Sequence, residues 1–184
     1  MMRRRTAAFT LTELLVIVAI IGILSSTALI STQRIRFERQ RTAINNAVRD
    51  LATWLELMRA EASRGRACTV TVTTSLSLAA GSTLASVTPT DCGNNLILDP
   101  DTASQSGPIA VSTNPSTTTI VFTSTGGAQP SSSLAVDGFN AVEVRLSSSA
   151  ANLRRCLAIS NGTGSLRFGA ANTSGGTCSY TAPL

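Results

Sequence analysis

The sequence predicts an α+β protein in which a long N-terminal helix, half membrane-spanning and half amphipathic, packs on an antiparallel β-sheet head. Two observations support this prediction. Helical apolar spacing continues to about residue 64, and no proline interrupts residues 9–64. From Ala67 onward the composition changes sharply, because Ser and Thr make up 37 of the 118 residues to the C-terminus and β-branched runs replace helix formers.

The first element is a stretch from Thr6 to Gln33 whose single charge is Glu13. The 28 residues between Arg5 and Arg34 exceed the roughly 20 helical residues that span a hydrocarbon core. Three arginines at positions 3–5 precede the stretch, so the positive-inside tendency places this end in the cytoplasm and the rest of the chain outside. A carboxylate near a bilayer centre costs roughly 2.5–3.5 kcal/mol, so Glu13 requires a functional reason.

Two simpler interpretations of this stretch remain open. A secretory signal peptide would also have a basic start and an apolar run, and Ser26-Thr27-Ala28 fits a small-x-small cleavage site. Against it, Glu13 interrupts the apolar run, and helical amphipathicity resumes directly after Arg34. A plain single-span anchor is the other alternative, and it leaves Glu13 unexplained.

The residues around Glu13 read Ala8-Phe9-Thr10-Leu11-Thr12-Glu13, after the basic leader and before the apolar helix. This pattern resembles the class III leader of type IV pilins and type II secretion pseudopilins. The resemblance implies that a prepilin peptidase cuts between Ala8 and Phe9 and that the new amine of Phe9 is N-methylated. The residue before the cut is usually Gly in that family, whereas this chain has Ala8, the next smallest residue.

The same resemblance gives Glu13 a partner. In the resembling filaments the Glu of an incoming subunit pairs with the N-terminal amine of its neighbour, so two charges that are each costly alone form a charge-assisted pair. It also implies a leader over 1–8, a transmembrane or filament-core helix over 9–33, an amphipathic helix over 34–66 and a β-rich head over 67–184. The subunit would cross the bacterial inner membrane once, with a cytoplasmic N-terminus and a periplasmic head, and would enter a periplasmic or extracellular filament on assembly.

The later part of the helix carries an apolar seam that predicts contact with the head. Its members recur at steps of four, three, four, three and four. They are Ile44, Val48, Leu51, Leu55, Met58 and Ala62. Trp54 and Leu57 lie beside the seam and are expected in the core as well, and Gly65 is the expected helix stop.

Period-two runs and turn residues predict a meander-like antiparallel head. The predicted strands are Cys68–Thr73, Asn95–Leu98, Ile109–Ser112, Thr118–Thr123, Phe139–Leu146, Arg155–Ser160 and Ser165–Phe168. Asn161-Gly162 between the last two predicts a hairpin whose loop extends as far as Gly164. Asp99 and Asp101 flank Pro100 in a predicted polar loop, where two carboxylates alone are weak evidence for calcium, so no metal site is predicted.

Four cysteines, Cys68, Cys92, Cys156 and Cys178, lie on the predicted outer side, where disulfides form in bacteria. No Cys-x-x-Cys motif points to redox or zinc chemistry. Three connectivities exist, and short loops favour Cys68–Cys92 with Cys156–Cys178. Each such loop would contribute about 3 kcal/mol in the chain-entropy treatment.

Charge is concentrated in one segment. All 15 basic residues are Arg, and removal of residues 1–8 would leave 12 Arg against 10 acids. Residues 34–66 hold eight Arg and four acids, a net charge of +4, whereas the chain from residue 67 has four Arg and five acids. A basic helix beside a membrane exit indicates headgroup contact or a solvated face rather than nucleic-acid binding.

The C-terminal half carries a second resemblance. Phe122 and Gly126 in Thr119-Ile120-Val121-Phe122-Thr123-Ser124-Thr125-Gly126, followed by Arg155-Cys156-Leu157-Ala158-Ile159-Ser160, resemble minor pilins of the GspH/FimT type. The resemblance implies a structural subunit of a type IV pilus or type II secretion pseudopilus, at or near the tip and active in assembly initiation. Implied partners are other pilins or pseudopilins, a prepilin peptidase, an inner-membrane platform protein and, indirectly, an assembly ATPase.

Two alternative functions remain open. Some members of this group bind DNA during natural transformation through a Gly-Arg-x-Arg motif, where this chain reads Gly164-Ser165-Leu166-Arg167 and lacks one Arg. Arg154, Arg155 and Arg167 would then form a small DNA-binding patch, although three Arg on an otherwise acidic head give little phosphate affinity. The third interpretation is a membrane-tethered β domain unrelated to pili.

An enzyme is not expected. The chain has no His, which removes Ser-His-Asp and Cys-His schemes and imidazole metal sites. Paired catalytic carboxylates, a phosphate-binding Gly-rich loop and a nucleophile elbow are also absent from the sequence. We therefore expect no catalytic residues, no cofactor and no small-molecule substrate.

Overall fold

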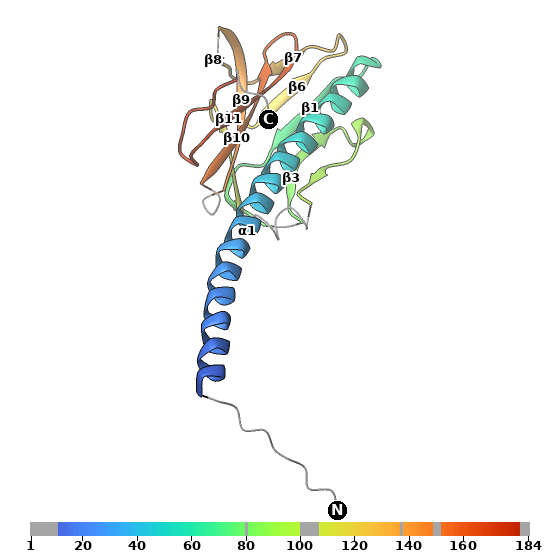
Figure 1. Ribbon diagram of the computed structural model, residues 1–184. Coiled ribbons are helices and arrows are strands. Elements are labelled where there is room, and N and C mark those ends of the chain that lie inside the picture. The colour runs from blue at the N-terminus through green and yellow to red at the C-terminus, as the bar shows by residue number, and fades with distance from the viewer. Residues whose placement is uncertain (1–10, 80, 100–106, 137, 149–151, 181–184) are drawn as a thin grey trace, which may run out of the picture. The chain divides into compact units, whose positions relative to one another are not determined.

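The structure is a computed structural model that describes residues 11–79, 81–99, 107–136, 138–148 and 152–180, without the side chains of residues 24, 26–34 and 36. The chain divides into two compact units, Met1–Glu38 and Arg39–Leu184. We call the second unit the head unit. Helix α1 runs through both units, and the strands all belong to the head unit (Figure 1).

Helix α1 spans Leu11–Ser63, a length of 53 residues. It ends where the backbone N–H groups of Gly65 and Arg66 both donate to the carbonyl oxygen of Ala62. Gly65 has a φ of 106°, a conformation that a residue without Cβ adopts at low cost. The predicted stop at Gly65 is therefore confirmed, while Phe9, the expected first helical residue, lies outside the described residues.

The head unit contains short strands and one turn of 3-10 helix. The strands are β1 Cys68–Val72, β2 Ser75–Leu78, β3 Thr83–Thr88, β4 Leu96–Ile97, β5 Ile109–Asn114, β6 Thr119–Phe122, β7 Ala128–Pro130, β8 Leu134–Val136, β9 Phe139–Ser148, β10 Leu153–Ser160 and β11 Leu166–Ala171, and the 3-10 turn is Thr90–Cys92. The last hairpin joins β10 to β11 through residues 161–165, as Asn161-Gly162 predicted.

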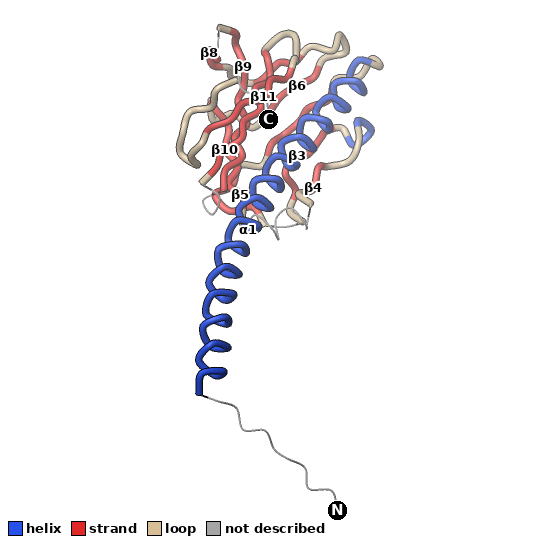
Figure 2. The backbone as a smooth tube through the Cα atoms, viewed as in Figure 1, coloured by secondary structure: helices blue, strands red, loops and turns tan. Residues whose placement is uncertain are grey.

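The strands form two antiparallel sheets, so the expectation of one meander is wrong. The first sheet has the order β4-β3-β1-β6-β7 and the second has the order β11-β10-β9-β5-β2, with β8 paired to β9. Adjacent strands β1 and β2 belong to different sheets, because β1 pairs with β3 and β6 whereas β2 pairs with β5. Figure 2 shows the strands gathered beside the later part of α1.

One hydrophobic core joins α1 to both sheets. All six seam residues between Ile44 and Ala62 are at most 1% exposed, and they share a cluster with residues of β1, β6, β9 and β10. The α+β class and the antiparallel head are thus confirmed. Trp54 is half-buried against this core, but Leu57 is 53% exposed, so its predicted place in the core is wrong. Leu57 lies two residues after Leu55, roughly 200° around the helix.

Two disulfides join segments that are distant in the sequence. Cys68 at the start of β1 is bonded to Cys92 at the end of the 3-10 turn, and Cys156 in β10 is bonded to Cys178 in the C-terminal segment. This is the pairing that loop length favoured. In the unfolded chain each disulfide closes a loop of about 25 residues, so each reduces the conformational entropy lost on folding.

The contrast between Leu55 and Leu57 gives a direct test of the core. Leu55→Ala should lower the free energy of unfolding by about 2–5 kcal/mol, because it leaves a cavity at a fully buried position. Leu57→Ala removes the same atoms from an exposed position and should change it by less than about 0.5 kcal/mol. Denaturant unfolding of the full chain measures both, and equal losses would contradict the described packing.

Candidate functional site

The N-terminal part of α1 exposes apolar side chains around its whole circumference. Five successive residues, 14–18, are each between 43% and 64% exposed, and Leu11 is 81% exposed. Five successive helical positions point in directions that together encircle the axis. A helix that is apolar all round is stable only where lipid or other protein covers it.

Of the predicted leader and assembly residues, Glu13 is the one that the described part of the chain includes. Glu13 lies in the first turn of α1 with an exposed side chain, where a carboxylate is favoured by the helix dipole. Ala8 and Phe9, the predicted cleavage and methylation positions, lie outside the described residues. Among the residues that the structure describes, no helical stretch is both long enough and apolar enough to cross a membrane.

The three arginines predicted to form a DNA-binding patch do not share a surface. In β10, Arg155 points to the same side as the core residues Leu157 and Ile159, is only 4% exposed and donates from Nε to Oδ1 of Asn45 on α1 at 2.7 Å. Arg154 points to the opposite side of the sheet. Arg155 therefore cannot reach a phosphate backbone, and the predicted patch of three is wrong, because neighbouring residues of a strand alternate between its faces.

Arg154 and Arg167 have partners within the head unit. Arg154 donates from Nη1 to the carbonyl oxygen of Gly176 at 2.7 Å, which holds the C-terminal segment. The guanidinium of Arg167 lies 4.3 Å from the ring centroid of Phe139, a cation–π contact. The strand register pairs Arg154 with Ala171 and Arg167 with Ala158, so the two side chains share a face but lie four residues apart along it, about 13 Å.

The C-terminal segment covers a buried ion pair on this same face. Glu143 is 4% exposed, and its Oε2 accepts from Nε of Arg145 at 2.8 Å. The Glu143 carboxylate and the sulfurs of Cys156 and Cys178 lie within 4.8 Å of one another. Because the two sulfurs are joined in a disulfide, they are not thiolate ligands. The group is therefore an ion pair beside a disulfide, and its two sulfurs do not offer metal ligands.

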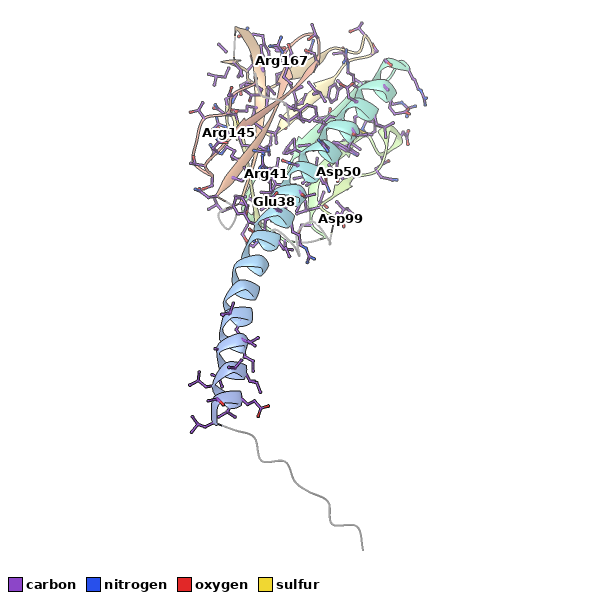
Figure 3. The ribbon with its side chains drawn as sticks, in the orientation of Figure 1. Glu38, Arg41, Asp50, Asp99, Arg145 and Arg167 are labelled. Carbon is purple, nitrogen blue, oxygen red and sulfur yellow. A yellow bond between two sulfur atoms is a disulfide. The ribbon has the colours of Figure 1, made fainter. Side chains whose placement is uncertain are left out.

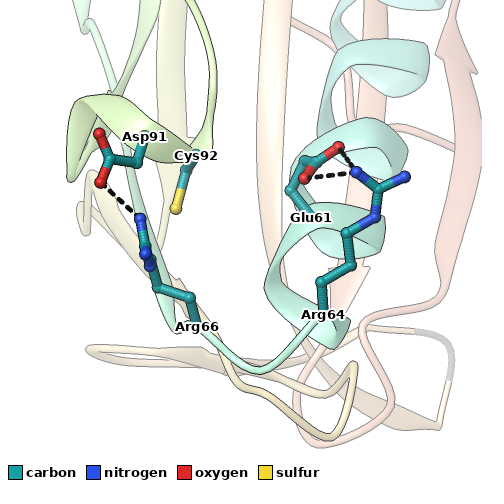
Figure 4. A pocket seen from close by; sticks show the side chains of 5 residues that line it. All are labelled: Glu61, Arg64, Arg66, Asp91 and Cys92. Carbon is teal, nitrogen blue, oxygen red and sulfur yellow. Dashed lines mark hydrogen bonds and ion pairs between the residues drawn. The ribbon is translucent and has the colours of Figure 1, made fainter.

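Shallow pockets surround the last turns of α1 (Figure 4). One of about 240 Å³ is lined by Glu61, Arg64, Arg66, Asp91 and Cys92. Two exposed ion pairs cross it, Arg64 with Glu61 at 2.8 Å and Arg66 with Asp91 at 2.5 Å. These pairs hold the chain between helix and β1, and exposed pairs of this kind contribute little to stability.

A second pocket, of about 380 Å³, is lined by residues that include Trp54, Leu57 and Asn94. The Trp54 Nε1–H donates to the carbonyl oxygen of Asn94 at 2.8 Å, which ties α1 to the loop after the 3-10 turn. The sequence predicted Trp54 only as a core residue. This bond could not be predicted from it, because the partner is a backbone atom 40 residues away.

Two carboxyls of the head unit repel each other. Asp50 on α1 and Asp99 on the loop after β4 are labelled in Figure 3. Partial burial, and then the charge of Asp99, raise the pKa of the Asp50 carboxyl above its ordinary value of 3.8. Asp101, the other acid of that predicted loop, lies outside the described residues, so this pair alone gives no ligand set for calcium.

Comparison with known families explains the combination of helix and head. The prokaryotic N-terminal methylation motif matches residues 3–29, which together with α1 and the antiparallel head defines a pilin-like protein. The family described as type II transport protein GspH matches residues 47–176, more than half of the 184-residue chain. The chain therefore belongs to the GspH family. No curated protein and no solved structure matches it.

Family membership sets the class of function. The protein is a type II secretion pseudopilin or minor pilin, a structural subunit rather than an enzyme. Such a subunit interacts with other pseudopilins and with the secretion machinery. The methylation motif and the family together imply a membrane-anchored protein whose head faces the periplasm.

The raised pKa of Asp50, caused by burial and then by the charge of Asp99, predicts a pH-dependent gain in stability from Asp50→Asn. A carboxyl whose pKa is higher in the folded state than in the unfolded state destabilises the fold once it is ionised, so its cost is absent well below pH 3.8 and complete above the raised pKa. Asp50→Asn should raise Tm by about 1–2 °C at pH 7, because Asp50 is exposed and screened.

The same gain should disappear at pH 3. Asp99→Asn should give a smaller rise at pH 7, because it removes only the second of the two causes and leaves the burial of Asp50 unchanged. Thermal unfolding of the full chain at both pH values measures these shifts. An Asp50→Asn variant that is less stable than the parent at pH 7 would show that the ionised carboxylate stabilises the fold instead.

Proposed function

We propose that this protein is a minor pseudopilin that joins a thin helical filament at or near its tip and helps to initiate assembly. A prepilin peptidase cuts between Ala8 and Phe9, and the new N-terminus is methylated. Residues 9–33 hold the subunit in the inner membrane until it is drawn into the filament. The disulfide-stapled head then presents its surface to partner subunits.

The observation that best supports this proposal is the apolar circumference of α1 between Leu11 and Ile23. Nine large apolar side chains there are at least 43% exposed, more than a solvated helix tolerates. Lipid covers these side chains before assembly, and the helices of neighbouring subunits cover them in the filament. The amphipathic seam that follows has its own cover in the head unit, so the two apolar surfaces of one helix serve different contacts.

Glu13 supplies recruitment and register in this proposal. Its carboxylate pairs with the N-terminal amine of a neighbouring subunit, and cleavage at Ala8/Phe9 creates that amine at the membrane. An ion pair in an apolar setting is favourable only when both charges and their hydrogen bonds meet in the right geometry. Pairing therefore selects one axial offset between subunits, whereas apolar contacts alone allow many.

The platform protein, the assembly ATPase and the other minor pilins are the proposed partners. The ATPase acts indirectly, because it works in the cytoplasm while the head lies on the other side of the membrane. The three-arginine surface on which a DNA-uptake role depended is not formed in the head unit, so we do not propose that role.

Substitution of Glu13 tests the pairing. Glu13→Ala should leave insertion and cleavage intact and reduce incorporation into sheared filaments by about tenfold or more, the loss expected for one charge-assisted contact. Glu38→Ala is the matched control, because it removes an exposed carboxylate of the same helix. Quantitative immunoblots of membrane and filament fractions measure the effect, and normal incorporation of Glu13→Ala would contradict the pairing role.

A further inference from the structure

Arg155 is a buried cation that forms no ion pair with an acid among the described residues. It is 4% exposed, its Nε donates to Asn45, and its Nη1 donates to the backbone carbonyl of Arg154 at 3.1 Å. Arginine is rarely buried unless a carboxylate offsets its charge. Across the described residues, none of the four ion pairs includes Arg155. Its charge is therefore solvated by an amide and a carbonyl, both neutral.

A second cation lies close to the first. Arg41 precedes Asn45 by four residues on α1, so the two side chains lie one above the other on the same helix face. Burial, and then the charge of Arg41, lower the pKa of the Arg155 guanidinium. The Arg41 side chain is exposed, and the ion pairs of the described residues do not include it either. Figure 3 labels Arg41 on α1.

A bound anion would make this arrangement more favourable. Two guanidiniums that repel each other, both charged at any physiological pH, create a locally positive potential. An oxyanion beside Arg41 would remove that repulsion and accept the paired N–H groups of a guanidinium, a geometry that matches phosphate. Asn45 fixes Arg155 through its Oδ1, so Arg155 acts as a positive charge behind the exposed Arg41.

We propose that Arg41, Asn45 and Arg155 form a site for the phosphate of an anionic phospholipid headgroup. Arg41 contacts the phosphate, Arg155 strengthens the attraction from behind, and Asn45 positions Arg155. The site would hold the unassembled subunit at a fixed height and orientation in the membrane.

The choice of a lipid rests on the proposed function, in which residues 9–33 lie in the membrane. Arg41 lies eight positions after Gln33, and eight helical steps rise about 12 Å, which places Arg41 within side-chain reach of the headgroups. Residues 34–66 carry a net charge of +4, with eight Arg against four acids. Basic segments at this position beside a membrane attract anionic lipid.

Lipid retention by the full chain tests the site. The chain is inserted into bilayer discs made of equal parts phosphatidylglycerol and phosphatidylcholine, and the lipids that remain bound after mild release are counted by native mass spectrometry. The wild type should retain phosphatidylglycerol preferentially. Arg41→Gln should reduce that preference about fivefold, and Arg155→Gln should act in the same direction if it folds.

Two controls make the result specific. Arg49→Gln removes the same charge from an exposed position of the same helix and should leave the preference unchanged. Excess inorganic phosphate should not displace the retained lipid, because the membrane holds the headgroup at the site at high local concentration. Displacement by free phosphate would overturn the lipid assignment.

Equal preferences in Arg41→Gln and Arg49→Gln would overturn the proposal, because general positive charge would then explain the retention. A chain that inserts but shows no preference for phosphatidylglycerol contradicts this inference alone. A chain that does not insert into the discs contradicts the proposed membrane anchoring, and the inference with it. The two failures are therefore distinguishable.

Discussion

The packing of the α1 seam against both sheets is the contact on which the rest of the head unit depends. Six seam residues between Ile44 and Ala62 are almost fully buried, and each sheet supplies strands to the same core. Single hydrogen bonds, such as the one from Arg155 to Asn45, link the helix to a sheet at one point, whereas burial of this apolar strip joins the helix to both sheets along its length. The disulfide from Cys68 to Cys92 strengthens the junction, because it ties the strand that follows the helix to the 3-10 turn.

The seam also limits what the rest of α1 can do. From Ile44 onward the helix has a buried face and a polar face, and the head unit satisfies its apolar residues. Between Leu11 and Ile23 the apolar residues encircle the helix and have no such cover within the described part of the chain. The filament proposal follows from this difference. The apolar face from Ile44 onward is covered within one subunit, whereas the apolar surface between Leu11 and Ile23 requires lipid or other subunits to cover it.

Much of the fold could be predicted from the sequence where one physical signal dominates. Apolar spacing identified every seam residue, and strand-like runs between turn residues identified β1, β4, β5, β6, β9, β10 and β11. Strands β2, β3, β7 and β8 were missed: Ser, Thr and Ala dominate the first two, and the last two are only three residues long. In β2, Leu76 and Leu78 alternate with Ser, but the two leucines do not form one buried face, because Leu76 is 94% exposed. The division into two sheets depends on long-range pairing that local patterns do not encode.

The site was harder to predict than the fold. Arg155 was expected on the surface because arginine is usually exposed. In a strand, however, Arg155 lies on the same face as Leu157 and Ile159, and Arg154 lies on the other face. The alternation along the strand could therefore have predicted that Arg155 is buried. The hydrogen bond from Arg155 to Asn45 could not be predicted from the sequence, because the two residues are 110 positions apart and no local pattern links them. The Asp50–Asp99 repulsion was hidden for the same reason.

The central claim is that Glu13 pairs with the amine that proteolysis creates at Phe9 of a neighbouring subunit. The mass and N-terminal sequence of the mature protein, purified from membranes of cells that contain a prepilin peptidase, test it most directly. The account predicts a chain that begins at Phe9 with a methylated amine. A chain that begins at Met1, or after Ala28 as a signal peptidase would leave it, would contradict the account.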